Sequence, residues 1–317
     1  MKISDIKDLS SRIKSNINKI IIGKQDTIDF ILTAVISGGH ILLEDTPGTG
    51  KTMMAKSLAK SLNADFSRIQ FTPDLLPSDI TGLNIFNQQK AAFEFIPGPV
   101  FNNIILADEI NRATPRTQSS LLECMEEKQV TVDGKTRELD KPFIVIATQN
   151  PIETSGTYPL PEAQLDRFMM QLSMGYPTEE EELLIIDRFI SSNPLENIEA
   201  VCSKEDLIIM RDVAKTVYVH PTIRQYIVDI IKATRNNPSI SLGASPRGTL
   251  AFVNAAQVYA AINGRDYVTP EDVKSLAVPI LAHRIILFTN LSKANSRVTL
   301  IKNILSSITV PTEDWNK

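Results

Sequence analysis

The spacing of hydrophobic positions changes near residue 177 and divides the chain into two parts. Before this point, short apolar runs of strand length alternate with stretches in which apolar residues recur every three or four positions. Such alternation predicts a parallel sheet between two layers of helices. After it, the pattern predicts helices only. We therefore expect a three-layer α/β domain over residues 1–176 and a smaller all-helical domain over residues 177–317.

The predicted helices have regular apolar faces and ordinary start and stop signals. One face of the opening helix holds Ile3, Ile6, Leu9, Ile13 and Ile17. A second helix is expected to end at Gly38-Gly39. Four later starts place Thr or Ser at the N-cap, with Pro or acids in the first turn: Thr114-Pro115, Thr178 to Glu181, Ser245-Pro246 and Thr269 to Asp272.

Two segments interrupt the sheet pattern. Residues 72–103 contain four prolines around short β-like pieces, and they form either a functional loop or a plain surface excursion. Residues 129–140 alternate in polarity around Asp133-Gly134, a dipeptide typical of a tight hairpin turn. Both segments are expected to lie outside the core of the sheet.

Composition limits the classes of function. The 317 residues are 43% hydrophobic and 22% charged, as in an ordinary globular protein. A net charge of −4 gives no electrostatic footprint for nucleic acid. No apolar stretch is long enough to span a membrane, and the charged N-terminus is no signal peptide. We therefore expect a cytoplasmic protein.

The residues that most often ligate metals are scattered. Cys124 and Cys202 are expected to be buried free thiols. The three histidines, His40, His220 and His283, lack metal-ligand spacing, so each is expected to be a core or capping residue. The tail with Trp315 is either a disordered end or a docking site for a partner.

Residues 40–52 have the order strand, glycine loop and helix that a phosphate-binding loop needs. Gly48 and Gly50 let backbone N–H groups approach phosphate oxygens, and the new helix adds its positive dipole end. Lys51 is placed to reach the β- and γ-phosphates, and the Thr52 hydroxyl to ligate Mg²⁺. The plain alternative is an ordinary glycine turn between a strand and a helix.

One residue departs from the phosphate-loop pattern. The pattern G-x-x-x-x-G-K-[ST] requires glycine at position 45, where this chain has Asp45. Aspartate tolerates left-handed backbone better than most residues, so the turn is expected to survive with the carboxylate directed away from the phosphates.

Two acids and an amide follow other buried strands. Asp108 and Glu109 end the run that starts at Ile104, where one acid can hold hydrated Mg²⁺ and the other can act on water. Asn150 ends a further strand and could bind the attacking water or the γ-phosphate. The plain alternatives are solvated acids and a turn-forming Asn before Pro.

These motifs occur in an order that resembles the MoxR family of AAA+ ATPases. The resemblance covers about residues 21–283 and rests on Thr46-Pro-Gly-Thr-Gly-Lys-Thr52, Asp108-Glu-Ile-Asn-Arg-Ala113, Gln118-Ser-Ser-Leu-Leu-Glu123, Gln129-Val-Thr-Val-Asp-Gly134, Ala147-Thr-Gln-Asn-Pro-Ile152, Pro161-Glu-Ala-Gln-Leu-Asp-Arg-Phe168, Gly243-Ala-Ser-Pro-Arg247 and Gly264-Arg-Asp-Tyr-Val-Thr-Pro270. It implies a P-loop NTPase core followed by a helical lid. In the same comparison, residues 72–103 resemble the helix-2 insert and residues 129–140 the pre-sensor 1 hairpin.

The resemblance also implies residue roles. Glu109, Asn150 and Arg167 would be catalytic, with Arg167 acting in the neighbouring subunit's site, and Thr52 and Asp108 would hold Mg²⁺. The implied ATP-binding residues are Ile22, Gly23, Thr46, Pro47, Gly48, Thr49, Gly50, Lys51, Thr52, Met53, Asp108 and Arg247.

The two arginines have plainer explanations as well. Arg247 lies on the opening turn of a helix, where it could point at a phosphate or be a surface residue near a cap. Arg167 has Asp166 beside it as a local ion-pair partner. Arg112 is a rival for the role in the neighbouring site.

The implied function is an ATPase that forms a hexameric ring and remodels or activates a client protein, in some family members with a von Willebrand factor A domain protein. The expected ligands are ATP and Mg²⁺. A P-loop small-molecule kinase and a nucleotide-dependent binding module with little hydrolysis are the alternatives. An assay of turnover against protein concentration separates the three.

Overall fold

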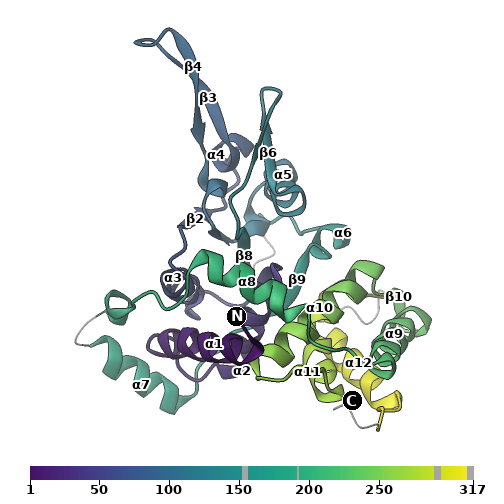
Figure 1. Ribbon diagram of the computed structural model, residues 1–317. Helices are drawn as coiled ribbons and strands as arrows, with labels where there is room; N and C mark the ends of the chain where they lie inside the picture. The colour runs from purple at the N-terminus through teal and green to yellow at the C-terminus, as the bar shows by residue number, and fades with distance from the viewer. Residues whose placement is uncertain (152–155, 191–192, 289–293, 313–317) are drawn as a thin grey trace.

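A computed structural model describes residues 1–151, 156–190, 193–288 and 294–312 (Figure 1). Trp315 lies outside these residues. The central sheet has five parallel strands in the order β2-β5-β8-β1-β9. These strands are β1 (His40–Glu44), β2 (Phe66–Gln70), β5 (Ile104–Asp108), β8 (Ile144–Gln149) and β9 (Phe168–Leu172).

Successive strand residues point to opposite faces of this sheet, and both faces are buried. In β1, Ile41 and Leu43 belong to one hydrophobic cluster and Leu42 to the other. In β5, Ile105 shares the cluster of Leu42. The period of two explains why the sequence shows continuous apolar runs, because a strand covered on both faces has no polar side. The predicted three-layer α/β architecture is confirmed.

Helices cover the two faces. The first face packs on α1 (Ile3–Asn18), α2 (Gln25–Ser37) and α3 (Lys51–Ser61), and the second on α4 (Pro77–Thr81) and α5 (Pro115–Glu127). Ile6, Ile13 and Ile17 of α1 are buried as predicted. α2 ends at Gly38, whose φ of 75° is left-handed, also as predicted. Thr114 is the N-cap residue of α5, but its hydroxyl caps no backbone N–H; it lies 3.2 Å from the Thr117 hydroxyl instead.

The C-terminal part is helical and shares the hydrophobic core of the first face. Its helices are α7 (Glu179–Phe189), α8 (Lys204–Ala214), α9 (Pro221–Asn236), α10 (Pro246–Ile262), α11 (Pro270–Leu281) and α12 (Ala294–Ser307). The capping boxes of α7 and α11 form as predicted. The prediction that this part contains nothing but helices misses one antiparallel ribbon, formed by β10 (Ile240–Leu242) and β11 (Ile286–Leu287).

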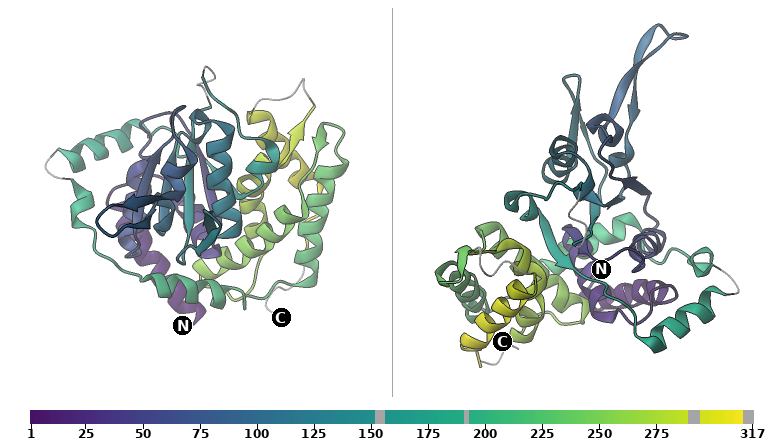
Figure 2. Two further views of the ribbon diagram at one scale, coloured as in Figure 1. Left: turned by 90° about the horizontal axis from the view of Figure 1, so that it is seen from above. Right: turned by 180° about the vertical axis from the view of Figure 1, so that it is seen from behind.

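Two hairpins project together from one end of the sheet (Figures 1 and 2). One is β3 (Gly82–Asn87) with β4 (Ala92–Pro97), within the proline-rich segment. The other is β6 (Gln129–Val132) with β7 (Lys135–Glu138), around the predicted Asp133-Gly134 turn. The side chain of Asn84 donates to Asp133 at 2.6 Å, and the Arg137 guanidinium lies 3.7 Å from the centre of the Phe95 ring. These two contacts connect the hairpins to each other.

The remaining elements are the short helices η1 (Pro99–Phe101), η2 (Ile110–Arg112), α6 (Glu162–Leu165), η3 (Pro194–Asn197) and η4 (Ala282–Arg284).

The cysteines and histidines have structural roles. Cys124 and Cys202 are buried free thiols, and burial raises the pKa of each to about 12. His40 accepts from the N–H of Val145 at 3.0 Å, so its other ring nitrogen donates to the carbonyl of Met125. Burial lowers the pKa of His40 to about 4. His283 is a second buried histidine, and His220 caps α9. The predicted core and capping roles are confirmed.

Candidate nucleotide site

The glycine loop connects β1 to α3 as the sequence predicts. Gly48 and Gly50 have φ values of 85° and 87°, which a residue with a Cβ adopts only with strain. Gly50 is the N-cap of α3 and offers no side-chain acceptor, so the first N–H groups of the helix are available to an anion. The Lys51 ammonium donates to the carbonyl oxygens of Asp45 and Thr46, both at 2.9 Å. Lysine and backbone donors therefore converge on one loop.

Asp45 behaves differently from the expectation. Its φ is not positive, so no left-handed residue is needed at this position. The buried carboxylate accepts from the Ser173 hydroxyl at 2.8 Å and from the N–H groups of Met174 at 2.5 Å and Gly175 at 3.1 Å. The expectation that this carboxylate points away from the phosphates stays a prediction. Asp45 thus joins the start of the phosphate loop to the segment that follows β9.

A narrow pocket of about 160 Å³ lies beside the loop. It is lined by Ile20, Ile21, Ile22, Lys24, Gly48, Thr49, Gly50, Met53, Met174, Gly175, Pro177, Ile185 and Phe189. Its walls thus come from the α1–α2 connection, the loop, the segment after β9 and α7. The structure brings the predicted Ile22, Gly48, Thr49, Gly50 and Met53 together here. A flat apolar base could insert between these walls, next to the phosphate loop.

Gly23 forms the turn before α2, with a φ of 74°. A Cβ at this position would lie 1.6 Å from a carboxylate oxygen of Glu181 on α7. Because this oxygen is the far end of a flexible side chain, the positive φ of Gly23, more than the space around it, is what favours glycine here. Lys24 adds a hydrogen bond of 2.9 Å to the carbonyl of Tyr176. With its ion pair to Glu181 at 3.7 Å, Lys24 connects the turn before α2 to the start of α7 and to the segment that precedes it.

Asp108 and Glu109 lie at the carboxyl end of β5, which is separated from β1 only by β8. Glu109 has a φ of 56°, a strained conformation for a residue that is not glycine, and such strain is frequent at functional sites. The Thr148 hydroxyl donates to Asp108 at 2.6 Å and accepts from the N–H of Glu109 at 2.8 Å. Asn150, which is buried, follows at the end of β8. These four residues lie on neighbouring strand ends.

Both acids carry partners that local sequence patterns do not reveal. Arg68 on β2 donates to Asp108 at 2.6 and 3.1 Å, and Gln70 donates to Glu109 at 2.8 Å. Arg112 forms an ion pair with Glu109 at 3.1 Å. Arg68 and Gln70 are two residues apart on β2, so their side chains share one face of the strand, and Gln70 pairs with Asp108 in the sheet register. The two-residue spacing is the only part of this arrangement that the sequence shows.

The residues fit a magnesium ion held mainly by a nucleotide. Within the described ranges, no group of three His, Cys, Asp or Glu side chains could hold a metal ion. Mg²⁺ commonly takes one or two carboxylates and completes its octahedron with phosphates and water. Asp108 at the end of β5 and Thr52 in the first turn of α3 are oxygen donors of the kind that such a site uses. Because Arg68 occupies one oxygen of Asp108 and is about half exposed, a cation must displace it or bind through water.

The structure places Arg167 and Arg247 together, but away from the pocket beside the loop. Both form ion pairs with Glu126 on α5, Arg167 at 3.6 Å. The plainer alternative for Arg167, an ion pair with Asp166, does not form, because Asp166 binds Arg284 at 2.7 Å instead. Arg247 lies on the first turn of α10 as predicted, yet its guanidinium is held at Glu126 and does not line the pocket of Gly48.

Relatives of known family share nearly the whole chain. A protein named YeaC from Bacillus subtilis (strain 168) is 49% identical over 310 residues, covering 98% of this chain and 97% of the relative. Chaperone MoxR1 of Mycobacterium tuberculosis is 40% identical and covers 93% of this chain and 80% of its own. Protein MoxR of Paracoccus denitrificans is 31% identical, with coverages of 90% and 91%. The chain belongs to the MoxR family of AAA+ ATPases.

Domain-level and structural comparisons agree with this membership. The family model described as "ATPase family associated with various cellular activities (AAA)" matches residues 40–170, and the AAA lid domain matches residues 232–304. The crystal structure of a candidate ATPase from Cytophaga hutchinsonii superposes with a TM-score of 0.90 at 41% identity, over 98% of this chain and 97% of the other. MoxR membership favours an ATPase over the kinase alternative. Among the helices of the described residues, none is long and apolar enough to cross a bilayer.

Proposed function

We propose that this MoxR-family protein binds and hydrolyses ATP with Mg²⁺ in a hexameric ring, and that turnover remodels or activates a client protein. The observation that carries the proposal is that the glycine loop with Lys51 follows β1, while Asp108 and Glu109 follow β5, so that only β8 separates the two at one edge of the sheet. The base would enter the pocket of Ile22 and Met53. The relatives named MoxR and chaperone MoxR1 support the chaperone-like task.

Each residue has a defined task in this proposal. The loop N–H groups and Lys51 bind the phosphates, and Thr52 and Asp108 hold Mg²⁺. Glu109 orients and deprotonates the attacking water, and Asn150 positions it against the γ-phosphate. For Glu109 to act, its carboxylate must leave Gln70 or Arg112, which are its present partners.

The two arginines would act on the neighbouring subunit's ATP. Their common partner Glu126 supports this role, because it gathers both guanidinium groups at a place separate from the chain's own pocket. A ring contact that replaced Glu126 with phosphate oxygens would keep each arginine paired with negative charge. Arg112, by contrast, is paired with Glu109 of its own chain, which favours Arg167 as the residue acting across the interface.

One observation favours the binding-module alternative. Arg68 binds the carboxylate of Asp108, and Gln70 and Arg112 bind that of Glu109. The isolated chain would therefore hydrolyse ATP slowly until these contacts break. The von Willebrand factor A partner, the hexamer and the domain boundary near residue 176 stay predictions.

Turnover of Mg²⁺-ATP measured against protein concentration tests the proposal, with Lys51→Ala and Glu109→Gln as variants. We expect activity per chain to rise steeply with concentration. Lys51→Ala should lose ATP affinity, whereas Glu109→Gln should keep affinity and lose turnover, because the acid acts only in the transition state. Activity independent of concentration would contradict the ring. Equal loss of affinity in both variants would contradict the role of Glu109.

A further inference from the structure

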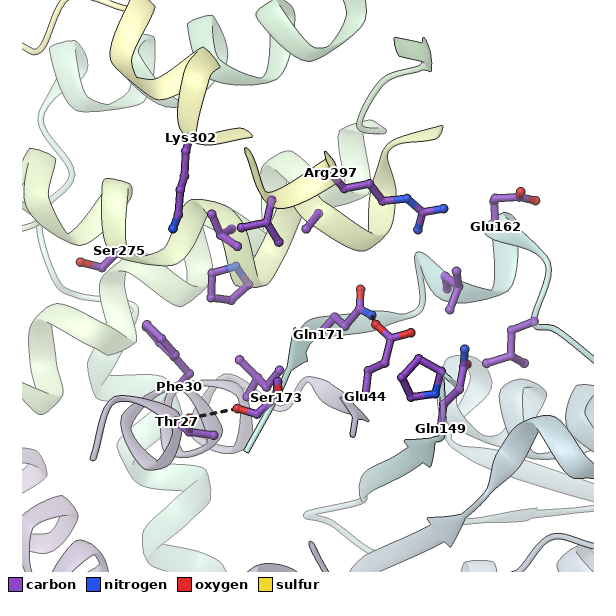
Figure 3. A pocket seen from close by; sticks show the side chains of 18 of the residues that line it. Thr27, Phe30, Glu44, Gln149, Glu162, Gln171, Ser173, Ser275, Arg297 and Lys302 are labelled. Carbon is purple, nitrogen blue, oxygen red and sulfur yellow. Dashed lines mark hydrogen bonds between the residues drawn. The ribbon is translucent and has the colours of Figure 1, made fainter. Parts of the chain in front are cut away.

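A cavity of about 830 Å³ lies between the carboxyl edge of the sheet and the lid helices (Figure 3). Its floor is formed by the ends of β1, β8 and β9, and its roof by α11 and α12. The volume is in the range of small-molecule sites, which in open α/β sheets lie at the carboxyl ends of strands. It shares none of its lining residues with the pocket beside the phosphate loop. The cavity is therefore a second, separate space.

Polar atoms without protein partners point to a ligand in this cavity. Among the described residues, the Arg297 Nε and the Gln149 Oε1 are buried without any hydrogen-bond partner. A buried polar group left unpaired costs about 1–3 kcal/mol, so such atoms are rare unless something completes them. Both residues line the cavity, one from the roof and one from the floor. In Figure 3, the Arg297 side chain runs in the direction of Glu162, above Glu44, Gln149 and Gln171.

The charge of the walls favours an anion. Arg297, Lys302 and Lys274 line the cavity against the acids Glu44 and Glu162. Lys302 points into the cavity from α12 in Figure 3. Burial raises the pKa of Glu44, and the Gln171 amide donates to its carboxylate. Among the described lining residues, three cations thus face two acids.

Apolar side chains complete the walls. Phe30 lies at the end of the cavity away from Arg297 in Figure 3, and Leu160, Val278 and Pro279 also line it. We propose that this cavity binds a small organic anion, with a carboxylate, sulfonate or phosphate group on Arg297 and an apolar body against these side chains. The site goes beyond the proposed ATPase function. Glu44 and Gln149 directly precede Asp45 and Asn150, so the ligand would lie next to the nucleotide site without entering it.

Two fluorescent probes of one shape test the proposal. 8-Anilino-1-naphthalenesulfonate has an apolar body and one anionic group, and N-phenyl-1-naphthylamine has the same body without the charge. In wild type, the sulfonate probe should bind a saturable site in the presence of saturating ATP. Arg297→Gln should weaken the sulfonate probe about tenfold and leave the neutral probe unchanged, because only the charge-assisted hydrogen bond is lost.

Two further variants separate the cavity from general surface binding. Val298→Trp fills the cavity from α12 and should weaken both probes. Arg116→Gln, which removes an exposed cation on α5 outside the cavity, should weaken neither. Unchanged sulfonate binding in Arg297→Gln overturns the proposal, even if Val298→Trp fails to fold. Competitive displacement of the probe by ATP, or equal weakening in Arg116→Gln, overturns it as well.

Discussion

Replacing Asp45 with glycine, which restores the standard phosphate loop, should harm ATP binding. The carboxylate accepts three hydrogen bonds from the segment of residues 173–175 and is only 6% exposed. Hydrogen bonds to charged groups contribute about 1.5–3 kcal/mol each. Glycine at this position provides no acceptor, so the backbone N–H groups of Met174 and Gly175 must form hydrogen bonds with water instead. After solvation of these donors, we expect a net loss of about 2–4 kcal/mol at this junction.

The loss should appear in recognition of the base more than in recognition of the phosphates. Met174, Gly175 and Pro177 line the pocket beside the loop, so their displacement opens its wall. The loop glycines and Lys51 are unchanged. We therefore expect Asp45→Gly to weaken ATP at least tenfold, or about 1.4 kcal/mol, and to leave inorganic tripolyphosphate nearly unaffected. Isothermal titration with both ligands measures the two effects.

Two control variants test whether the effect comes from the Asp45 carboxylate. Ser173→Ala removes one of the three donors and should have a smaller effect on ATP. Asp74→Gly changes an exposed carboxylate outside the site and should have none. If Asp45→Gly binds ATP as wild type or better, the carboxylate merely tolerates the turn and the junction has no role. Equal weakening of ATP and tripolyphosphate would place the effect in the phosphate loop itself.

Two other predictions follow from single contacts. Arg68→Gln frees one oxygen of Asp108 and should lower the Mg²⁺ concentration needed for half-maximal ATP turnover, whereas an unchanged or higher requirement would show that Arg68 does not compete with the metal. For His40, burial lowers the pKa to about 4, so between about pH 6.5 and 4 the unfolded chain binds a proton that the folded chain does not. Stability should therefore fall as pH falls, by about 2 kcal/mol at pH 5 from this residue, and urea unfolding of His40→Asn at pH 7.5 and 5 should show a smaller fall than wild type and His220→Asn.

The sequence predicted most of the fold because strand and helix periods depend on near neighbours. Ile104 to Ala107 are buried on both faces, so their apolar run is visible without the structure. The β10–β11 ribbon was missed because strands of three and two residues are too short to show a period. Thr114 was placed correctly as an N-cap residue, but a position does not fix where its hydroxyl points.

The site was predictable where its residues are close in sequence. The phosphate loop and the acids after β5 have local patterns, and the structure places them at the same edge of the sheet with only β8 between their strands. The partners of these residues come from distant segments: Arg68 lies 40 positions before Asp108, and Glu126 lies 121 before Arg247. Such ion pairs depend on how the elements pack, and many alternative pairs satisfy charge alone. For this reason the sequence left Asp166 open as an alternative partner of Arg167.

Mixing two inactive variants tests most directly whether active sites are shared between subunits. Arg167→Ala and Glu109→Gln should each bind ATP and hydrolyse it poorly, since an arginine acting across an interface can contribute about 10³–10⁵ in rate. When subunits exchange, a chain with intact Glu109 can receive the intact Arg167 of its neighbour, and turnover should return. A mixture as inactive as its components, with exchange confirmed by fluorescence energy transfer between labelled chains, would contradict the shared site. The same mixture with Arg112→Ala in place of Arg167→Ala should give no such recovery.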